Sequence, residues 1–392
     1  MKIRIGVLFG GRSVEHEVSI ITALQAINHM DKEKYEIVPI YIDKRGIWYT
    51  GAMLLDMEIY KDLDLLKRYA KEVVLYNRDG CFVLQKKKGI FKSIVSEIDL
   101  AFPIMHGTNG EDGTLQGYLE TIGIPYCESD TYSAVVGQDK VFMKQIWKAC
   151  GVPIVKFDWF FDSEFNSNSE KIIERLEKLG YPMIVKPARL GSSVGIKVCK
   201  NEVELYEAIE DAINYDNKIL VEEVVNNLVE VNISVLGNYQ KQSVSVIEEV
   251  GGTNDFLTYE DKYISGAKGP SKGMASAIRI IPARISEKLQ KEVEDIAVLA
   301  YKSLNSTGVV RIDFLIDSKE EKVYANEINS IPGSLAYYLW EKTDKTYQEE
   351  LEDILTIAVR TYKNKNNKIH SFDTNILSNY SKNAVKGIKG GK

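Results

Sequence analysis

The stretch VVRIDFLIDSKEEKVYANEINS, residues 309–330, contains two runs of alternating apolar and polar residues around a charged turn. This pattern predicts two antiparallel strands joined in a hairpin. If the hairpin is symmetric about its turn and has no bulge, Arg311 lies opposite Asn329, and Asp313 lies opposite Glu327. Because side chains alternate between the two faces of a strand, all four then share one face of the hairpin.

This shared face places two carboxylates directly across from each other, where they repel. A divalent cation between Asp313 and Glu327 would remove the repulsion, and Asp, Glu and Asn supply the oxygen ligands that Mg²⁺ prefers. Arg311 beside such a site could hold a developing anion. The alternative interpretation is a solvated face on which the arginine screens the acids. The opposite face is apolar and includes Ile312, Phe314 and Ile328.

Two lysines are candidate phosphate ligands for such a magnesium site. Lys186 ends the apolar run in MIVKPARLGSSVG and points toward a glycine-rich turn whose N–H groups can bind anions, and Lys140 opens a predicted helix. Each lysine alone is equally well explained as a solubilising residue. The chain has no Walker loop, no H-E-x-x-H zinc motif and no recognisable nucleophile. Phosphoryl transfer, which depends on positioning, metal ions and cations, fits these residues better.

The order of predicted strands and helices divides the chain into parts. Residues 1–128 alternate strands and helices, which predicts a parallel sheet, with a hairpin insertion at about residues 50–96. Residues 129–222 form a small α+β unit, and residues 223–365 are mainly strands with two long helices. Residues 366–392 form a basic polar tail. The predicted fold class is therefore α/β and α+β.

The composition is that of an ordinary globular protein, with 392 residues of which 44% are hydrophobic and 27% charged. The formal net charge of −6 gives no reason to expect nucleic acid or a membrane surface as a partner. Four scattered cysteines indicate a reducing compartment. No apolar run is long enough for a signal peptide or a membrane span, so we expect a cytoplasmic protein.

The N-terminal stretch GGRSVEHEVSI, residues 10–20, places a glycine-rich turn between a predicted strand and a predicted helix. Such turns usually bind phosphate. Here the glycines are followed by Glu15, His16 and Glu17, without a lysine or threonine. Acids in the first turn of a helix suit its dipole, which is a sufficient local explanation, but their charge argues against phosphate.

Six motifs, taken in order, resemble the D-alanine–D-alanine ligases of the ATP-grasp superfamily: GGRSVEHEVSI, HGTNGEDGTLQG, VKPARLGSSVGI, YEDKY, RIDF and NEINSIPGS. The resemblance covers the chain from Met1 to about Tyr362. It implies a pre-ATP-grasp domain with a parallel sheet, followed by a lid domain and a catalytic domain that together form an ATP-grasp fold. It further implies ATP-dependent ligation of two D-alanine molecules through an acyl phosphate, for peptidoglycan precursor synthesis. The implied cofactors are ATP and two Mg²⁺ ions, which Mn²⁺ could replace, and the implied assembly is a homodimer.

The resemblance also assigns roles to individual residues. Glu15, Ser192 and Tyr263 would orient the first amino acid, with Glu15 meeting its ammonium group. Arg311 and the N–H of Gly333 would hold the oxyanion. Asp313, Glu327 and Asn329 would be the magnesium ligands, which agrees with the hairpin argument. The residues implied in nucleotide binding are Lys140, Lys186, Glu222, Glu223, Val225, Glu230 and Lys262.

The segment PGSLAYYLWE departs from the family pattern. The pocket for the second substrate would include His106, Ser334 and Tyr338, so its size and polarity would differ from those of the family. An ungapped match puts Tyr338 where the family has a serine that binds the carboxylate of the second substrate. Tyr263 stands where relatives that use D-lactate often have histidine, which argues for an amine as the attacking group. Two alternatives remain: the same mechanism with another second substrate such as D-serine, or a nucleotide-binding homologue without ligase activity.

Overall fold

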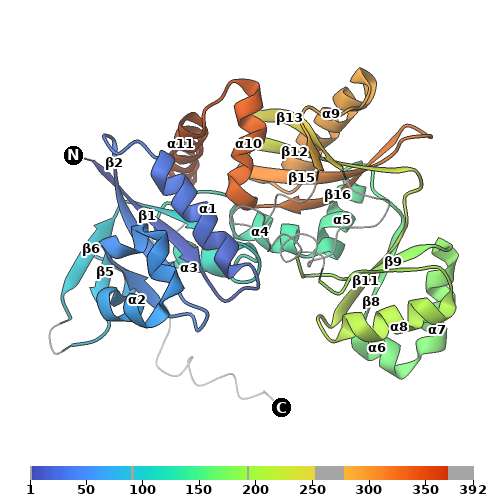
Figure 1. Cartoon of the computed structure of the whole chain (residues 1–392), viewed down its shortest axis with the longest axis horizontal. Coiled ribbons are helices and arrows are strands. Elements are labelled where there is room, and N and C mark those ends of the chain that lie inside the picture. The colour runs from blue at the N-terminus through green and yellow to red at the C-terminus, as the bar shows by residue number, and fades with distance from the viewer. Residues whose placement is uncertain (1, 90–91, 192–193, 252–277, 370–392) are drawn as a thin grey trace, which may run out of the picture.

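Three β-sheets with surrounding helices make up the computed structural model, which describes residues 2–89, 92–191, 194–251 and 278–369. Figure 1 shows the N-terminal sheet in blue on the left, the C-terminal sheet in yellow and orange at the centre, and a small green sheet on the right. Within these ranges, no helix has the length and apolar character needed to cross a membrane.

The N-terminal sheet has seven strands, of which three are parallel. They are β1 (Ile3–Gly10), β2 (Tyr35–Ile42) and β7 (Leu100–Ile104). β1 pairs in parallel with both β2 and β7, as the alternation of strands and helices predicts. The accompanying helices are α1 (His16–His29) and α3 (Thr114–Ile122).

The predicted hairpin insertion continues this sheet with antiparallel strands. β4 and β5 form the hairpin, and the strand order of the whole sheet is β6-β5-β4-β3-β2-β1-β7. The N-terminal sheet is therefore mixed, because the insertion adds its strands to the edge of β2. The added elements are β3 (Trp48–Thr50), η1 (Ala52–Leu55), η2 (Met57–Lys61), α2 (Leu63–Tyr69), β4 (Lys71–Arg78), β5 (Cys81–Lys86) and β6 (Ile94–Ile98).

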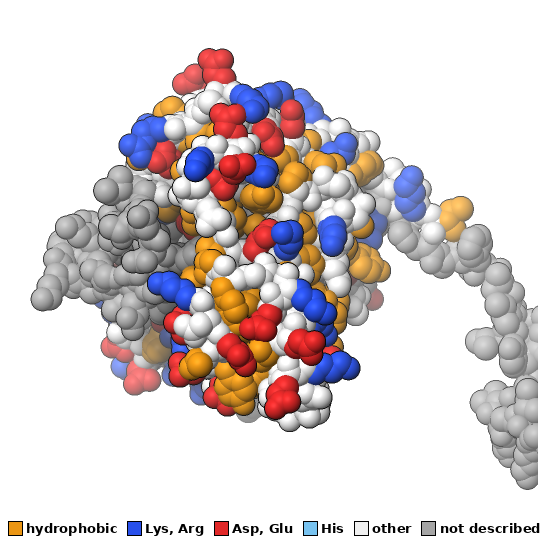
Figure 2. Space-filling model, turned by 90° about the vertical axis from the view of Figure 1, so that its right-hand side faces the viewer, with side chains coloured by type: hydrophobic (Ala, Val, Ile, Leu, Met, Phe, Trp, Pro, Cys, Tyr) orange, Lys and Arg blue, Asp and Glu red, His pale blue; other side chains and the backbone are white. Residues whose placement is uncertain are grey.

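The small sheet on the right of Figure 1 is formed by the middle part of the chain and is called the central sheet below. It is antiparallel, with the strand order β10-β9-β11-β8. Figure 2 looks onto this side of the molecule and shows hydrophobic side chains gathered between acidic ones in its lower half. The exposed apolar residues of this part include Val203 and Tyr215. Its elements are β8 (Phe157–Phe161), α6 (Asp162–Ser167), α7 (Ser169–Leu176), η3 (Glu177–Leu179), β9 (Met183–Pro187), β10 (Lys197–Cys199), α8 (Glu202–Ile213) and β11 (Lys218–Glu223).

The C-terminal sheet is also antiparallel, in the order β14-β13-β12-β15-β16. Its apolar face packs against α9 and α5, and α5 contributes Met143 and Trp147 to this core. The elements are α4 (Thr131–Gln138), α5 (Lys140–Ala149), β12 (Leu228–Gly237), β13 (Gln242–Gly251), β14 (Ile278–Ile280), α9 (Glu287–Ser303), β15 (Gly308–Asp317) and β16 (Lys322–Asn329).

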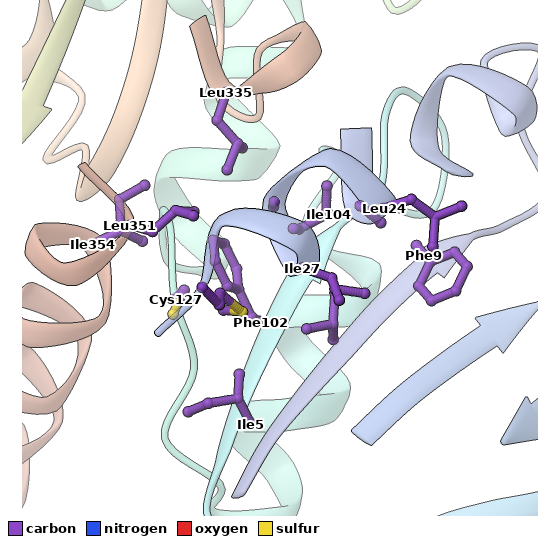
Figure 3. Packing of buried hydrophobic residues seen from close by; sticks show 14 of the residues in the cluster. Ile5, Phe9, Leu24, Ile27, Phe102, Ile104, Cys127, Leu335, Leu351 and Ile354 are labelled. Atoms are coloured by element: carbon purple, nitrogen blue, oxygen red, sulfur yellow. The ribbon is translucent and has the colours of Figure 1, made fainter. Parts of the chain in front are cut away.

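One hydrophobic cluster joins the N-terminal sheet to the end of the chain. Ile5 and Phe102 of the N-terminal sheet belong to the same cluster as Leu335, Leu351 and Ile354, and Figure 3 shows these side chains gathered around α1. The C-terminal elements are η5 (Gly333–Ala336), α10 (Tyr337–Trp340), η6 (Glu341–Thr343) and α11 (Tyr347–Asn366). The N-terminal domain and the C-terminal sheet therefore share a core.

The chain turns left-handed directly after β16 and Pro332. Ser334, Leu335 and Ala336 have φ angles of +51°, +53° and +58°, values that non-glycine residues rarely adopt. Leu335 and Ala336 are fully buried in this conformation. The surrounding structure must therefore hold this short segment in place.

Candidate active site

The hairpin of β15 and β16 has the predicted register at the site. Arg311 pairs with Asn329, and Asp313 pairs with Glu327. Period-two alternation then puts the four polar side chains on one face, as the sequence predicts.

The hairpin contains a bulge, so the condition under which its register was derived holds only on one side of the bulge. The register shifts between Asp313 and Phe314, so that Phe314 pairs with Ala325. The bulge adds Asn326 to β16, and its Oδ1 lies 3.4 Å from the Nζ of Lys186. The extra residue thereby contacts a lysine of the central sheet.

One face of the C-terminal sheet carries a row of four polar residues from four adjacent strands. Glu248 of β13 lies opposite Asn232 of β12, Asn232 lies opposite Asp313, and Asp313 lies opposite Glu327. Adjacent strands are about 4.8 Å apart, so the row extends over about 14 Å.

Arg311 and Asp313 form a two-point ion pair beside this row. Nε of Arg311 lies 2.7 Å from Oδ1 of Asp313, and Nη2 lies 2.9 Å from Oδ2. Burial alone would lower the pKa of Arg311, but the Asp313 carboxylate outweighs burial and raises that pKa well above its usual value. The guanidinium is therefore always charged, as a group that holds an anion must be.

The ligands around Asp313 suit a hard cation. Asp313, Glu327 and Asn329 lie together on the hairpin and offer two carboxylates and an amide oxygen. Magnesium prefers such donors and commonly completes its shell with water and substrate phosphates. Among the residues that the structure describes, no three His, Cys, Asp or Glu side chains are grouped to hold a metal by themselves. The set therefore fits an ion that is shared with a phosphate ligand.

Two lysines meet on one buried carboxylate between the central and C-terminal sheets. Oε1 of Glu222 lies 2.6 Å from Nζ of Lys144, and Oε2 lies 2.5 Å from Nζ of Lys186. Burial alone would raise the pKa of Glu222, but the two ammonium groups outweigh burial and lower that pKa to about 2. Burial would likewise lower the pKa of Lys186, and Glu222 raises it. Burial lowers the pKa of Lys144, so Lys186 is the more firmly charged of the two and the better candidate to meet a phosphate.

Lys140 connects the glycine-rich turn after β9 with the hairpin. Its Nζ donates to the carbonyl oxygen of Leu190 at 2.8 Å and lies 3.5 Å from Oε2 of Glu327. The predicted phosphate lysines and the predicted metal ligands therefore converge on one place.

The carboxylate of Glu15 lies where two glycine-rich turns meet. If Gly107 carried a side chain, its Cβ would lie 2.6 Å from Oε2 of Glu15, which is too close. The Cβ of a side chain at Gly191 would lie 3.6 Å from the same oxygen. Gly107 also has a φ of +68°, which favours glycine. The turns therefore approach Glu15 through bare backbone.

Side chains of the N-terminal domain hold the segment that follows β16. Nδ1 of His106 lies 2.7 Å from the carbonyl oxygen of Ile331, and Nε2 lies 2.9 Å from Oγ1 of Thr22. The same Oγ1 accepts a hydrogen bond from the N–H of Ser334, whose hydroxyl donates to Gln25. His106 and Ser334, both predicted in the second-substrate pocket, are thus engaged in positioning this segment.

Glu111 joins the same two segments. Its Oε2 accepts a hydrogen bond from the N–H of Gly107 at 2.8 Å. Its Oε1 accepts from the N–H of Ile331 at 2.9 Å and from the hydroxyl of Ser330 at 3.3 Å. Burial, with a further contribution from the charge of Glu15, raises the pKa of Glu111 to about 7. The carboxyl group therefore couples the glycine turn to the loop after β16.

Tyr338 belongs to a polar cluster at the β13 end of the row. Its hydroxyl donates to Oε2 of Glu248 at 3.0 Å. Nε of Arg279 lies 3.4 Å from Oε1 of Glu248, and the guanidinium carbon lies 4.8 Å from the centre of the Tyr338 ring. Burial raises the pKa of Tyr338 to about 12, so the hydroxyl keeps its proton.

The remaining predicted site residues lie along the connection between the sheets or beyond the described ranges. Glu223 accepts a hydrogen bond from the N–H of Lys156 at 2.9 Å, and Val225 lies half-buried before β12. The charge of Glu230, on β12, contributes to the raised pKa of Lys186, so Glu230 lies on the side of the sheet that faces the lysines. Gly333 begins η5. Ser192, Lys262 and Tyr263 lie outside the described residues.

His16 and Glu17 brace the N-terminal glycine turn. Nδ1 of His16 lies 2.7 Å from the carbonyl oxygen of Gly11, and Nε2 lies 3.0 Å from the hydroxyl of Tyr41. Glu17 pairs with Lys44 at 2.6 Å. These contacts fix the turn that carries Glu15 against β2.

Two family models match most of the chain. The D-ala D-ala ligase N-terminus matches residues 4–129, and the D-ala D-ala ligase C-terminus matches residues 146–364. The chain belongs to the D-alanine–D-alanine ligase family. The predicted fold class, an α/β N-terminal domain followed by an ATP-grasp fold, is confirmed.

Several members of the D-alanine–D-alanine ligase family are similar over nearly their whole length. The D-alanine–D-alanine ligase of Thermosipho melanesiensis is 42% identical over 376 residues, which are 96% of this chain and 98% of the relative. The structure of the ligase from Coxiella burnetii has a TM-score of 0.78 at 28% identity and covers 93% of this chain and 96% of its own. The VanG D-Ala:D-Ser ligase from Enterococcus faecalis has a TM-score of 0.77 at 30% identity, covering 91% and 100%. The Bacillus anthracis ligase complexed with ATP has a TM-score of 0.65 at 26% identity, covering 93% and 99%.

Sequence reasoning missed three residues at this ligase site. Lys144 stands four residues after Lys140 on one helix, and this spacing was a usable signal. Glu111 lies within HGTNGEDGTLQG, a motif quoted for the resemblance without a role for this residue. Glu248 has no motif around it, and only strand pairing brings it into the row.

Proposed function

We propose that this chain is an ATP-dependent D-alanine–D-alanine ligase that supplies peptidoglycan precursors. The observation that carries the proposal is the 3.5 Å approach of the Lys140 ammonium to the Glu327 carboxylate, where the lysines meet the acidic hairpin. The similarity to a D-alanine–D-alanine ligase over 96% of the chain supports it. The related Bacillus anthracis structure, complexed with ATP, supports ATP as co-substrate.

The reaction has two steps. A carboxylate oxygen of the first D-alanine attacks the γ-phosphorus of ATP, the bond to the ADP oxygen breaks, and an acyl phosphate forms. The neutral amino group of the second D-alanine then attacks the acyl carbon, the bond to phosphate breaks, and the amine loses its proton. Lys140 and Lys186 would hold the transferring phosphoryl group. Arg311 and the N–H of Gly333 would hold the oxyanion of the second step.

Other residues would hold the substrates and the metal. Glu15 would bind the ammonium group of the first D-alanine, since its carboxylate lies among bare glycine turns. Asp313, Glu327 and Asn329 would hold two Mg²⁺ ions, or Mn²⁺ in their place. When bound, these ions neutralise the phosphate charge. Lys262 would bind the nucleotide and Tyr263 would help to orient the first amino acid, as the resemblance implies; both lie outside the described residues.

The proposal is tested by following phosphate and dipeptide release from the purified full chain with ATP, Mg²⁺ and D-alanine. Glu327→Ala should abolish turnover, because it removes a metal ligand that also faces Lys140. Glu320→Ala, in the exposed turn of the same hairpin, is the matched control and should keep wild-type rates. No phosphate release by the wild type would contradict the function. Near-normal turnover by Glu327→Ala would contradict the metal assignment alone.

Another second substrate is the alternative that a specific observation favours. An ungapped match puts Tyr338 at the position of the expected serine, and the chain is 30% identical to a D-Ala:D-Ser ligase. Competition among D-alanine, D-serine and D-lactate as acceptors separates the two functions. Binding of ATP without turnover for any acceptor would instead identify a homologue without ligase activity.

We also propose that the enzyme works in the cytoplasm as a homodimer. All four cysteines are free, which suits a reducing compartment. Measurement of the solution mass by light scattering tests the dimer.

A further inference from the structure

We propose that Arg279, held by Glu248 and Tyr338, binds the carboxylate of the second amino acid and so selects the acceptor. This inference rests on the proposed function. It gives a role to Glu248 and Arg279, which no motif of the sequence assigns.

The place of the cluster in the row points to the acceptor side. Glu327, at one end of the row, faces Lys140 and the phosphate lysines. Glu248 lies two strands beyond Asp313, about 10 Å along the sheet. The lysines proposed to hold the phosphoryl group lie at the Glu327 end, so the second amino acid has its access to the acyl carbon from the Glu248 end.

The cluster also adjoins the group that would hold the oxyanion. Asn232 lies opposite Glu248 on one side and Asp313 on the other, and Oδ1 of Asp313 lies 2.7 Å from Nε of Arg311. The amide of Asn232 reaches Oε2 of Glu248 at 3.4 Å in one orientation and Oδ1 of Asp313 at 3.1 Å in the other. A ligand on Arg279 would therefore stand next to the reacting carbon.

Glu248 serves as the buried anchor of the cluster. Its side chain is only 1% exposed, and Oε2 accepts the Tyr338 hydroxyl. Within the described residues, Oε1 has no hydrogen-bond partner and faces the Arg279 guanidinium at 3.4 Å. A buried carboxylate needs a counter-charge, and Arg279 provides it. The pair thereby fixes the position of the arginine.

Arg279 is the exposed member and has a second binding edge. Its side chain is 31% exposed, and the edge that contains Nε faces Glu248. The planar guanidinium can use its two Nη groups for another carboxylate in a bidentate pair. The Tyr338 ring lies below the guanidinium and restrains its plane. A tyrosine at the expected serine position therefore supports an arginine that performs the same recognition.

The neighbouring Arg284 and Glu249 provide a matched control. Nη2 of Arg284 lies 2.5 Å from Oε1 of Glu249, an ion pair of the same kind one residue further along β13. Successive side chains of a strand point to opposite faces, so this pair lies away from the row. Its arginine is 69% exposed, and its removal leaves the proposed site intact.

The test is a competition between D-alanine and D-alaninamide as acceptors. The full-length enzyme receives ATP, Mg²⁺ and both amines, and mass spectrometry measures D-alanyl-D-alanine against its C-terminal amide. Arg279→Met should reduce the wild-type preference for the free acid by about tenfold or more, because a site built for a polar group rejects analogues that lack it. Arg279→Lys should keep part of the preference, and Arg284→Met should keep all of it. The KM for ATP should stay unchanged in all three.

A binding measurement tests the role of Arg279 in carboxylate recognition without turnover. Calorimetry with ADP present compares D-alanyl-D-alanine with its C-terminal amide, and only the wild type and Arg284→Met should prefer the acid. If Arg279→Met keeps the wild-type preference in both measurements, the inference is wrong. A wild type that binds the acid preferentially but forms no dipeptide contradicts the proposed function alone. A wild type that binds neither peptide contradicts both.

Discussion

Two fully buried glutamates of this chain have opposite protonation. Glu222 lies between Lys144 and Lys186, and the two ammonium groups keep its pKa at about 2. Glu350, in the first turn of α11, has no hydrogen-bond partner for either carboxyl oxygen among the described residues. Burial, with a contribution from the charge of Glu128, raises the pKa of Glu350 well above its usual value. Burial sets the cost of a charge, and the neighbours decide whether the charge persists.

Each state suits its location. The proposed phosphate-binding region needs a charged lysine before ATP arrives, and Glu222 holds Lys186 in place and raises its pKa. The interface of α11 with the N-terminal domain is apolar around Leu351 and Ile354, and there a neutral carboxyl group is tolerated.

The largest effect is expected from Glu222→Ala. Removal of one partner leaves two buried ammonium groups without a counter-charge, which costs about 3–5 kcal/mol of unfolding free energy. ATP binding should weaken as well, because Lys186 loses the contact that orients it. Urea unfolding and ATP titration measure the two effects.

Glu223→Ala is the matched control for the stability effect only, because the resemblance implies a role for Glu223 itself in nucleotide binding. Its carboxylate pairs with the exposed Lys156, so the loss should stay below about 1 kcal/mol. Equal destabilisation by both variants would contradict the comparison. In the wild type, the contribution of Glu222 should be complete above about pH 4.3 and lost as the pH falls toward 2, since its folded-state pKa is lowered.

Glu350→Gln should change the pH dependence of stability. The folded state keeps the Glu350 proton, which the unfolded chain releases above about pH 4.3. Glu350 therefore lowers the free energy of unfolding of the wild type by about 1.4 kcal/mol for each unit that the pH rises above this value. The variant loses this contribution, so its stability relative to the wild type should rise as the pH increases above about 4.3. Urea unfolding at several pH values measures it.

The neighbours of Glu350 and a control substitution make this prediction specific. The charges of Glu128, Asp353 and Glu341 add to the raised pKa, and Lys345 opposes it. Glu207→Gln, on the exposed side of α8, should leave the slope unchanged. Parallel pH curves for wild type and Glu350→Gln would show that Glu350 is ionised when folded.

Glu111→Gln should give the smallest effect, with a pH dependence that ends near pH 7. The amide can accept only on one side, so one backbone N–H, of Gly107 or Ile331, loses its partner at about 1–2 kcal/mol. Since burial raises the pKa of Glu111 to about 7, the effect of Glu111 on the pH dependence of stability should end near pH 7. Stability of wild type and variant measured at pH 6, 7 and 8 checks this. A difference between the two that keeps changing up to pH 8 would contradict it.

The sequence was most informative where local alternation alone determines geometry. The pairing of Asp313 with Glu327 followed from period two, because both strands keep one register on that side of the bulge. The bulge at Asn326 was not predictable, since no residue type in KVYANEIN marks it. Glu248 and Lys144 gain their roles only when separate strands and helices come together. The charge of Glu222 likewise depends on two lysines that are distant in the sequence.

The left-handed segment Ser334–Ala336 has a consequence for how the enzyme assembles. A left-handed residue with a side chain costs about 1–2 kcal/mol, so the segment keeps its shape only while other contacts offset that cost. Those contacts come from Thr22 and Gln25 of the N-terminal domain and from the shared core around Leu335. Gly333, whose N–H would hold the oxyanion, directly precedes the segment. The N-terminal domain must therefore dock correctly before Gly333 can take its place at the active site, and the enzyme is inactive until the two domains have assembled.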